Sequence, residues 1–321
     1  MNVLILGSGG LGSVYGGLLA EAGHTVTLVA RGAQLAAIRS RGLTLQTPNG
    51  IVKPRLHVVE KPDEVSSADI AFVTVKAKDT DSILEASKNL YDGTVFASLQ
   101  NSGNKDTILA NYVGNANVVG AVTIVAGALI EPGIVKQTYS GHTWFGELPS
   151  GTSKRVENFA SALNQAGLPA STTENITMVR WVKLAHYCAY AGVSCLTRLR
   201  LAQIWQDPQL SRIYIQALRE CAEVMKAKGI TPQKVDGLPP LPKILVTPDE
   251  ILIQQLATLG KTLAARRATE TISMLVDVLK GRKTEADETL GYVTAEASEN
   301  RVEAPTLQTM YTLIRGLEKS Y

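Results

Sequence analysis

Cysteine and histidine are scarce in this sequence, with three cysteines and four histidines among 321 residues. The cysteines are Cys188, Cys195 and Cys221, an odd number without C-x-x-C spacing, which predicts reduced thiols that lie mostly in the core. The histidines have no metal-ligand spacing with one another or with the cysteines. We therefore predict a protein without a metal site.

An excess of charge and a long apolar run are also absent. The 32 basic and 29 acidic residues give a net charge of +3 and form no basic stripe, which argues against a nucleic-acid-binding protein. The longest apolar stretch, residues 118–130, is too short to span a bilayer, and no basic segment precedes the apolar N-terminus. We expect a cytoplasmic protein that is not bound to membranes. Its length and its hydrophobic content of 45% suit two domains better than one.

The best-defined motif is a glycine turn close to the N-terminus. An apolar run, residues 1–6, is followed directly by Gly7, Ser8, Gly9, Gly10, Leu11 and Gly12, and then by a helix-like segment, residues 13–22. With a second strand over residues 24–30, this is the context that a dinucleotide pyrophosphate site requires. We expect Gly7 to permit the tight turn, Gly9 the close approach of the phosphates, and Gly12 the contact between helix and strand.

The end of the second strand indicates which dinucleotide binds. NAD-selective sites usually carry Asp or Glu about 20 residues after the glycines, whereas this strand ends in Ala30, Arg31 and Gly32. A guanidinium group can form paired hydrogen bonds with a 2′-phosphate. We therefore predict NADP(H) as the cofactor and Arg31 as the residue that binds its 2′-phosphate. The alternative is that Arg31 is only a solvated residue at a strand end.

Two further buried strands are expected over residues 69–75 and 94–99, with a crossover helix over residues 79–90 between them. Ligands of open α/β sheets lie beyond the carboxyl ends of the strands. We therefore expect Lys76 and Asn101, which follow these two strands, near the cofactor and the substrate. The alternative for both residues is a side chain that faces water or caps a helix.

The other elements of the N-terminal half are helix-like segments over residues 33–41 and 152–166, and several strands. A hairpin around Pro48-Asn49-Gly50 is expected to join residues 43–46 to residues 53–60. We expect strands over residues 118–124, 134–140 and 143–147 to complete the sheet, the last two being antiparallel.

From residue 175 onward, apolar residues recur only at helical spacing. This pattern predicts helices over residues 176–193, 208–228, 248–264, 269–279, 285–300 and 305–317, with a proline-rich loop over residues 239–242. The predicted fold is α/β, with a Rossmann-type NADP-binding domain over residues 1–174. An all-helical domain over residues 175–321 is expected to bind the substrate and to mediate dimerisation.

Lys183 lies in the first predicted helix, which is apolar nearly all round and is therefore expected to be buried. Such a lysine is either held in a cleft or extends to an edge of the helix. An ammonium group beside a ketone that accepts hydride would stabilise the charge on oxygen and deliver the proton, so Lys183 is the candidate general acid. For Glu285 the residues alone favour ordinary helix-end chemistry, because Thr284 precedes several acidic residues.

At these residues the chain resembles the ketopantoate reductases (2-dehydropantoate 2-reductases), and the resemblance covers essentially its whole length. It is carried by the turn 7–12 with Arg31, by residues 73–77, Gln100-Asn101, Glu131-Pro132-Gly133, Gly146-Glu147 and 181–185, and by residues 273–277 followed by 281–287. The resemblance implies that Lys183 is the general acid and that Glu285 orients the substrate. It also implies substrate contacts for Ser273 and Asn101, and a place for Lys76 near the nicotinamide. The family reduces a 2-oxo acid with NADPH in pantothenate synthesis.

The chain departs from the family at several positions expected to contact the substrate. The family commonly has Asn four and eight residues after the catalytic lysine, where this chain has Tyr187 and Ala191. Glu270 stands three residues before Ser273 in place of an Asn, and its charge would repel a carboxylate. Asn101 is followed by Ser102 instead of Gly. The catalytic pair and the cofactor site are therefore retained while the substrate contacts are altered.

We accordingly expect an NADPH-dependent reductase of a small-molecule carbonyl compound, with ketopantoate as the first substrate to test. A ketone or imine that is less polar or lacks a carboxylate is the alternative. A third hypothesis is a protein that senses NADPH and catalyses no reaction, although a sensor has no need of a general acid such as Lys183.

Overall fold

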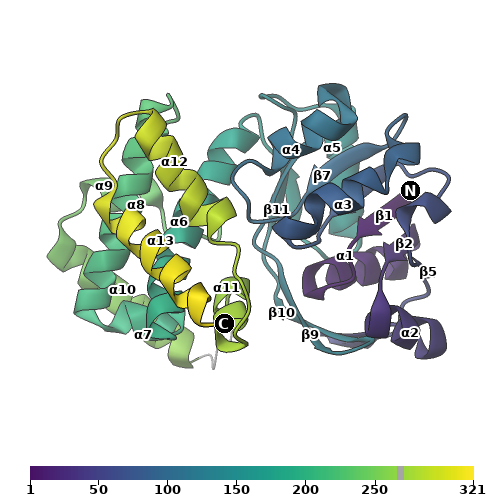
Figure 1. The fold of residues 1–321 in the computed structure, drawn as a ribbon, viewed down its shortest axis with the longest axis horizontal. Coiled ribbons are helices and arrows are strands. Elements are labelled where there is room, and N and C mark those ends of the chain that lie inside the picture. The colour runs from purple at the N-terminus through teal and green to yellow at the C-terminus, as the bar shows by residue number, and fades with distance from the viewer. Residues whose placement is uncertain (266–270) are drawn as a thin grey trace. The chain divides into compact units, whose positions relative to one another are not determined.

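The computed structural model describes residues 1–265 and 271–321, which divide into two compact units. The first unit comprises Met1–Gln100 and Asn104–Thr177, and the second comprises Asn101–Gly103 and Met178–Tyr321. In Figure 1 the strands belong to the purple to teal N-terminal part, and the green to yellow C-terminal part is helical. The predicted fold class, a Rossmann-type α/β unit followed by a helical region, is confirmed.

A parallel sheet forms the centre of the first unit. Its strand order is β5-β2-β1-β6-β7, and all of its pairings are parallel. Side chains alternate between the two faces of a strand, so the apolar run of β1 contributes Val3 and Ile5 to one core cluster and Leu4 and Leu6 to another. The strands are β1 (Asn2–Leu6), β2 (Thr25–Val29), β5 (His57–Val59), β6 (Ile70–Val73) and β7 (Val95–Ser98).

The helices of the first unit include the two expected after β1 and β2. The expected crossover helix over residues 79–90 is instead broken, and the hydroxyl of Ser87 donates to the carbonyl of Ile83 where the helix would continue (2.7 Å). The helices are α1 (Gly10–Glu21), α2 (Gly32–Arg41), α3 (Thr80–Glu85), α4 (Lys105–Val113) and α5 (Lys154–Gln165), with short turns η1 (Pro62–Glu64), η2 (Ala77–Asp79), η3 (Lys88–Leu90) and η4 (Asn115–Asn117).

The remaining strands form two smaller sheets, in the orders β4-β3-β10-β9 and β12-β11-β8. The expected antiparallel pairing of residues 134–140 with 143–147 is wrong. The strand over residues 134–139 pairs instead with an unexpected strand, β9, across the turn at Pro132 and Gly133. The strands are β3 (Thr44–Thr47), β4 (Gly50–Val52), β8 (Gly120–Thr123), β9 (Ala126–Glu131), β10 (Ile134–Tyr139), β11 (Thr143–Gly146) and β12 (Ala170–Thr172).

The expected hairpin is also corrected. The partner of β3 is β4, because the turn at Pro48 and Asn49 brings Thr47 directly opposite Gly50. Pro54, which has no N–H to donate to a strand pairing, follows closely after β4. The later segment β5 therefore leaves the hairpin and pairs with β2 in the central sheet.

The second unit is built from helices (Figure 1). An unexpected helix, α9, begins at Leu241 inside the predicted proline-rich loop, because proline is tolerated in a first helical turn. Residues 269 and 270, where another helix was expected to begin, lie outside the described residues. The helices are α6 (Ile176–Thr197), α7 (Leu201–Gln206), α8 (Pro208–Ala227), α9 (Leu241–Val246), α10 (Asp249–Ala265), α11 (Ser273–Leu279), the π-helical turn η5 (Asp287–Gly291), α12 (Tyr292–Glu299), α13 (Pro305–Leu317) and η6 (Glu318–Ser320).

The three cysteines are buried and free, as the sequence predicted for the core. Within residues 1–265 and 271–321, none of the helices combines the length and the apolar character needed to cross a membrane. The same residues contain no cluster of three or more His, Cys, Asp or Glu side chains that could hold a metal ion.

Candidate active site

The glycine turn follows β1 and leads into α1. Gly7 has a φ of +121°, which favours glycine, and a Cβ on Gly7 would lie 2.9 Å from the backbone nitrogen of Val75. A Cβ on Gly12 would lie 2.0 Å from the carbonyl oxygen of Gly7 and 2.5 Å from the hydroxyl of Thr74. Both glycines are therefore required for the close packing of β1, α1 and the segment after β6.

Gly9 has a different role from its neighbours. A Cβ on Gly9 would meet no atom within 4 Å, so this side of the turn is open. Gly9 caps α1, and the first N–H groups of a helix of this length have no partner within the helix. The carbonyl oxygen of Ser8 accepts hydrogen bonds from the Ser13 hydroxyl (3.1 Å) and the Gln34 side-chain amide (3.0 Å), which fix the turn. Open space beside a held helix N-terminus fits a nucleotide pyrophosphate.

Gly10 packs against a strand that the sequence did not predict. A Cβ on Gly10 would lie 2.1 Å from the carbonyl oxygen of Gly127 in β9, and a Cβ on Gly127 would lie 2.5 Å from the carbonyl oxygen of Gly10. Leu11, the next residue, packs partly buried against the core. The sequence showed Gly127 only as part of an apolar stretch, so its pairing with the turn was not predictable.

Arg31 is the N-cap of α2 and comes two residues after the end of β2. Ala30 is buried and Gly32 has no side chain, so no carboxylate accompanies Arg31 at the end of this strand. The guanidinium Nη2 lies 3.3 Å from the Oδ1 of Asp79, and 80% of the Arg31 side chain is exposed. The absence of an acidic residue at the end of β2 fits a cofactor with a 2′-phosphate, whereas the ion pair of Arg31 with Asp79 was not expected from the sequence.

Lys76 lies three residues after β6 and is half-buried. The segment that carries it is fixed by Gln100, whose side-chain amide donates to the carbonyl oxygen of Val75 (2.8 Å) and to the hydroxyl of Thr80 (2.7 Å). Gln100 comes two residues after β7, so it joins the two segments that leave the adjacent strands β6 and β7. The sequence included Gln100 in the resemblance but assigned it no structural role.

In the second unit, Lys183 of α6 is half-buried, and its Nζ donates a hydrogen bond to the Oδ1 of Asn101. The same Nζ lies 5.7 Å from the centre of the Tyr187 ring, one helical turn further along. The sequence left two alternatives for Lys183, and the amine is not free at an exposed edge. Asn101, expected at a strand end, is its hydrogen-bond acceptor.

Tyr187 connects α6 to α11. Its hydroxyl lies 3.0 Å from the Oγ of Ser273, the first residue of α11. Burial, together with the negative charge of Glu285, raises the pKa of Tyr187 well above its ordinary value, so its phenol stays protonated. Lys183 thus contacts Asn101 and Tyr187, Tyr187 contacts Ser273, and the charge of Glu285 acts on Tyr187.

Glu285 is half-buried, and its neighbour Thr284 accepts a hydrogen bond from the N–H of Ala286 (3.1 Å). The sequence favoured Thr284 as the helix cap, but the N-cap of η5 is Ala286, and the acidic residues of its first turn are Asp287 and Glu288. Ala191 is fully buried, so its side chain serves the core of the helix. Glu270 lies outside the described residues.

A glycine that the sequence did not single out holds the Asn101 segment. The N–H of Gly103 donates to the carbonyl oxygen of Glu288 (3.0 Å), and a Cβ on Gly103 would lie 2.0 Å from the ring of Tyr292. Ser102, at the position where the family usually has Gly, is buried.

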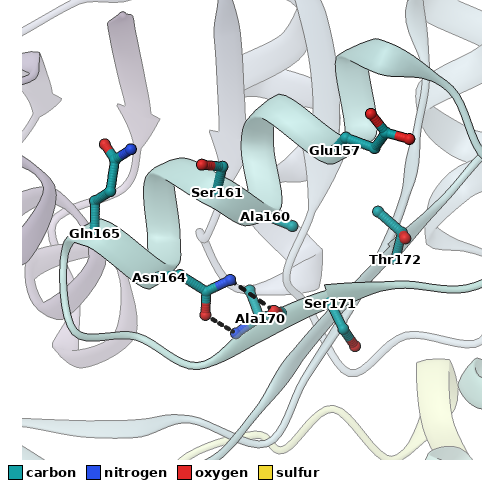
Figure 2. A pocket seen from close by; sticks show the side chains of 8 residues that line it. All are labelled: Glu157, Ala160, Ser161, Asn164, Gln165, Ala170, Ser171 and Thr172. Atoms are coloured by element: carbon teal, nitrogen blue, oxygen red, sulfur yellow. Dashed lines mark hydrogen bonds between the residues drawn. The ribbon is translucent and has the colours of Figure 1, made fainter.

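A surface hollow between α5 and β12 contains none of the predicted site residues. Figure 2 shows Asn164 bridging the N–H and the carbonyl oxygen of Ala170 at its floor (2.9 Å for both hydrogen bonds). This amide therefore satisfies the backbone groups of Ala170 at the start of β12 and serves the fold.

Comparison with known proteins gives matches along nearly the whole chain. Family models described as ketopantoate reductase PanE/ApbA and its C-terminal part match residues 3–150 and 175–318. The 2-dehydropantoate 2-reductase of Pyrococcus horikoshii is 30% identical over 321 residues, which covers 99% of this chain and 98% of that protein.

Solved structures give the same result for the fold. The PanE/ApbA family ketopantoate reductase from Ralstonia eutropha JMP134 is 26% identical with a TM-score of 0.83, covering 100% of this chain and 99% of that one. A ternary structure of D-mandelate dehydrogenase with NADH and anilino(oxo)acetate has a TM-score of 0.86 at 22% identity, with the same coverage. The chain thus belongs to the ketopantoate reductase family and is an oxidoreductase that acts on CH–OH groups.

Proposed function

We propose that this enzyme uses NADPH to reduce a 2-oxo acid to the 2-hydroxy acid, with 2-dehydropantoate as the first candidate substrate. The observation that carries the proposal is the half-buried Lys183 ammonium, hydrogen-bonded to Asn101 beside Tyr187, Ser273 and Glu285. In this proposal the first unit binds the cofactor, and the second unit binds the substrate and pairs two copies of the chain. The buried free cysteines suit a reducing cytoplasm.

The cofactor-binding part of the proposal rests on the glycine turn. Gly9 leaves room for the pyrophosphate at the N-terminus of α1, Arg31 would bind the 2′-phosphate, and Lys76 and Asn101 would lie near the nicotinamide. The cofactor, when bound, supplies the hydride that forms the new C–H bond.

The residues of the second unit supply the proton and bind the substrate. As the carbonyl π bond breaks, negative charge collects on oxygen, and Lys183 transfers a proton from Nζ to complete the alcohol. The Asn101 oxygen orients this ammonium group before the reaction. Glu285 holds the substrate and the lysine in register, and the Ser273 hydroxyl contacts the substrate carboxylate.

A second candidate substrate is a ketone or imine that is less polar or lacks a carboxylate. Tyr187 favours this candidate because it places an aromatic ring where the family commonly has an amide. Its hydroxyl is also hydrogen-bonded to the hydroxyl of Ser273. Tyr187→Asn should therefore raise the preference for 2-dehydropantoate over a ketone without a carboxylate, as measured by the ratio of the two kcat/KM values.

The purified protein should be tested with NADPH and with NADH against 2-dehydropantoate, other 2-oxo acids, and ketones and imines without a carboxylate. Loss of the reduced-nicotinamide absorbance with NADPH and a 2-oxo acid is the expected result. A best substrate without a carboxylate would favour the second candidate. Tight NADPH binding without turnover of any compound would contradict both and favour a sensor.

A further inference from the structure

Arg31 and Asp79 come from strands on either side of β1. Arg31 follows β2, Asp79 lies in η2 after β6, and β1 itself carries the glycine turn. Their ion pair, with 3.3 Å between Nη2 and Oδ1, therefore lies at the edge of the sheet where the ribose next to the adenine is expected. The Asp79 carboxylate thus reaches this edge from β6, the strand on the other side of β1, whereas the position after β2 has no acidic residue.

Asp79 is the fixed partner of the pair. Only 25% of its side chain is exposed, against 80% for Arg31. Its N–H donates to the carbonyl oxygen of Lys76 (2.8 Å), and its carbonyl oxygen accepts from the hydroxyl of Ser82 (3.0 Å). The next residue, Thr80, is held by Gln100. The long arginine side chain is therefore the member that can turn toward a ligand.

We propose that Asp79 is a specificity-determining residue that occupies Arg31 in the absence of a 2′-phosphate and competes with that phosphate for it. This inference rests on the proposed role of Arg31. A 2′-phosphate must displace the carboxylate from the guanidinium group, whereas NADH, which lacks this phosphate, leaves the pair intact. Asp79 therefore weakens the binding of NADPH and reduces the preference of the protein for NADPH over NADH.

The expected effect is moderate because the pair is exposed. Removing the competing carboxylate should tighten NADPH binding about threefold to fivefold at low ionic strength. The gain should shrink in high salt, because exposed charges are screened over about 10 Å at 0.1 M.

The test is to measure the dissociation constants of NADPH and NADH by the fluorescence of the reduced nicotinamide. The proteins are the wild type, Asp79→Asn, Arg31→Ala and the double variant. Glu157→Gln is the matched control, because it removes a carboxylate from another exposed ion pair of the same unit (3.4 Å to Lys154). We expect Asp79→Asn alone to tighten NADPH binding, NADH binding to change less than about twofold, and the gain to disappear when Arg31 is also replaced.

The possible failures are distinguishable. A selective loss of NADPH binding in Arg31→Ala, with no gain in Asp79→Asn, would overturn this inference alone. Weaker NADH binding in Asp79→Asn would also overturn it, since the carboxylate would then hold the ribose hydroxyl. Equal losses of both cofactors in Arg31→Ala would overturn the NADP(H) assignment together with this inference. If Glu157→Gln tightened NADPH binding by the same factor as Asp79→Asn, the effect would come from the change in net charge alone, and the inference would be wrong.

Discussion

Replacing Lys183 tests the chemical step most directly. In Lys183→Ala the developing oxyanion loses both its proton donor and a positive charge. Two unit charges about 3 Å apart at an effective dielectric constant of about 20 interact by about 5 kcal/mol. General acids contribute about 10²- to 10⁴-fold to the rate, or about 3 to 5 kcal/mol of barrier. We therefore expect kcat to fall by about 10³-fold.

The environment of the amine predicts how related variants behave. The Asn101 oxygen accepts the hydrogen bond of Nζ, so Asn101→Ala leaves the acid present but less well oriented. Its loss in kcat should be smaller, about tenfold to a hundredfold. Lys183→Arg keeps the charge but has a guanidinium group that does not give up its proton, so it should recover substrate binding more than turnover.

Lys228→Ala is the matched control for Lys183→Ala. Lys228 also stands over an aromatic ring of α6, with Nζ 5.9 Å from the centre of the Trp181 ring, and it pairs with Glu296 (2.5 Å). Its removal should lower stability but not the rate of the chemical step. The assay follows reduced nicotinamide in single-turnover and steady-state experiments, with NADPH affinity measured separately. Turnover of Lys183→Ala within about threefold of the wild type would refute a role for this lysine as the acid.

Three further predictions concern the second unit. Gly103→Ala should lower the free energy of unfolding by about 1–3 kcal/mol, because its Cβ would overlap the Tyr292 ring, and Tyr292→Leu should restore part of the loss in denaturant unfolding. Glu220→Gln should cost about 2 kcal/mol in the same assay, because the buried carboxylate accepts two backbone N–H groups at the start of α13 (2.9 and 3.0 Å). Burial lowers the pKa of His186 to about 4, below its unfolded value of about 6.5, so the unfolded state binds the extra proton. Stability should therefore fall by about 3 kcal/mol between pH 6.5 and pH 4, and His186→Gln should weaken this pH dependence.

The parts of the fold that the sequence predicted are those whose signals are local. The glycine turn, α1 and β2 follow one another within 31 residues, and each has its own pattern of apolar residues or glycines. The helix α13 begins and ends at the predicted residues because Pro305 opens a continuous amphipathic run. In such segments the hydrogen bonds and the apolar spacing lie within a few residues of one another.

Strand pairing was predicted less well, because short apolar strands do not encode their partners. The segments over residues 134–139 and 143–146 are close in sequence but pair in different sheets. The unpredicted β9 supplies the partner of the first one, and it also presents Gly127 to Gly10. The strands β8 and β11 are buried along their whole length, so they lack the alternating pattern that would have indicated register.

The sequence alone determined that the chain begins with a strand, glycine turn and helix suited to a nucleotide, and that one lysine lies in an apolar helix. Only the tertiary structure decided what these residues meet: Lys183 reaches Asn101 across 82 positions, Tyr187 reaches Ser273 across 86, and Arg31 reaches Asp79 across 48. A local pattern follows from backbone geometry and apolar spacing within a few turns. Contacts between distant residues depend on how whole elements pack, which no stretch of the chain specifies by itself.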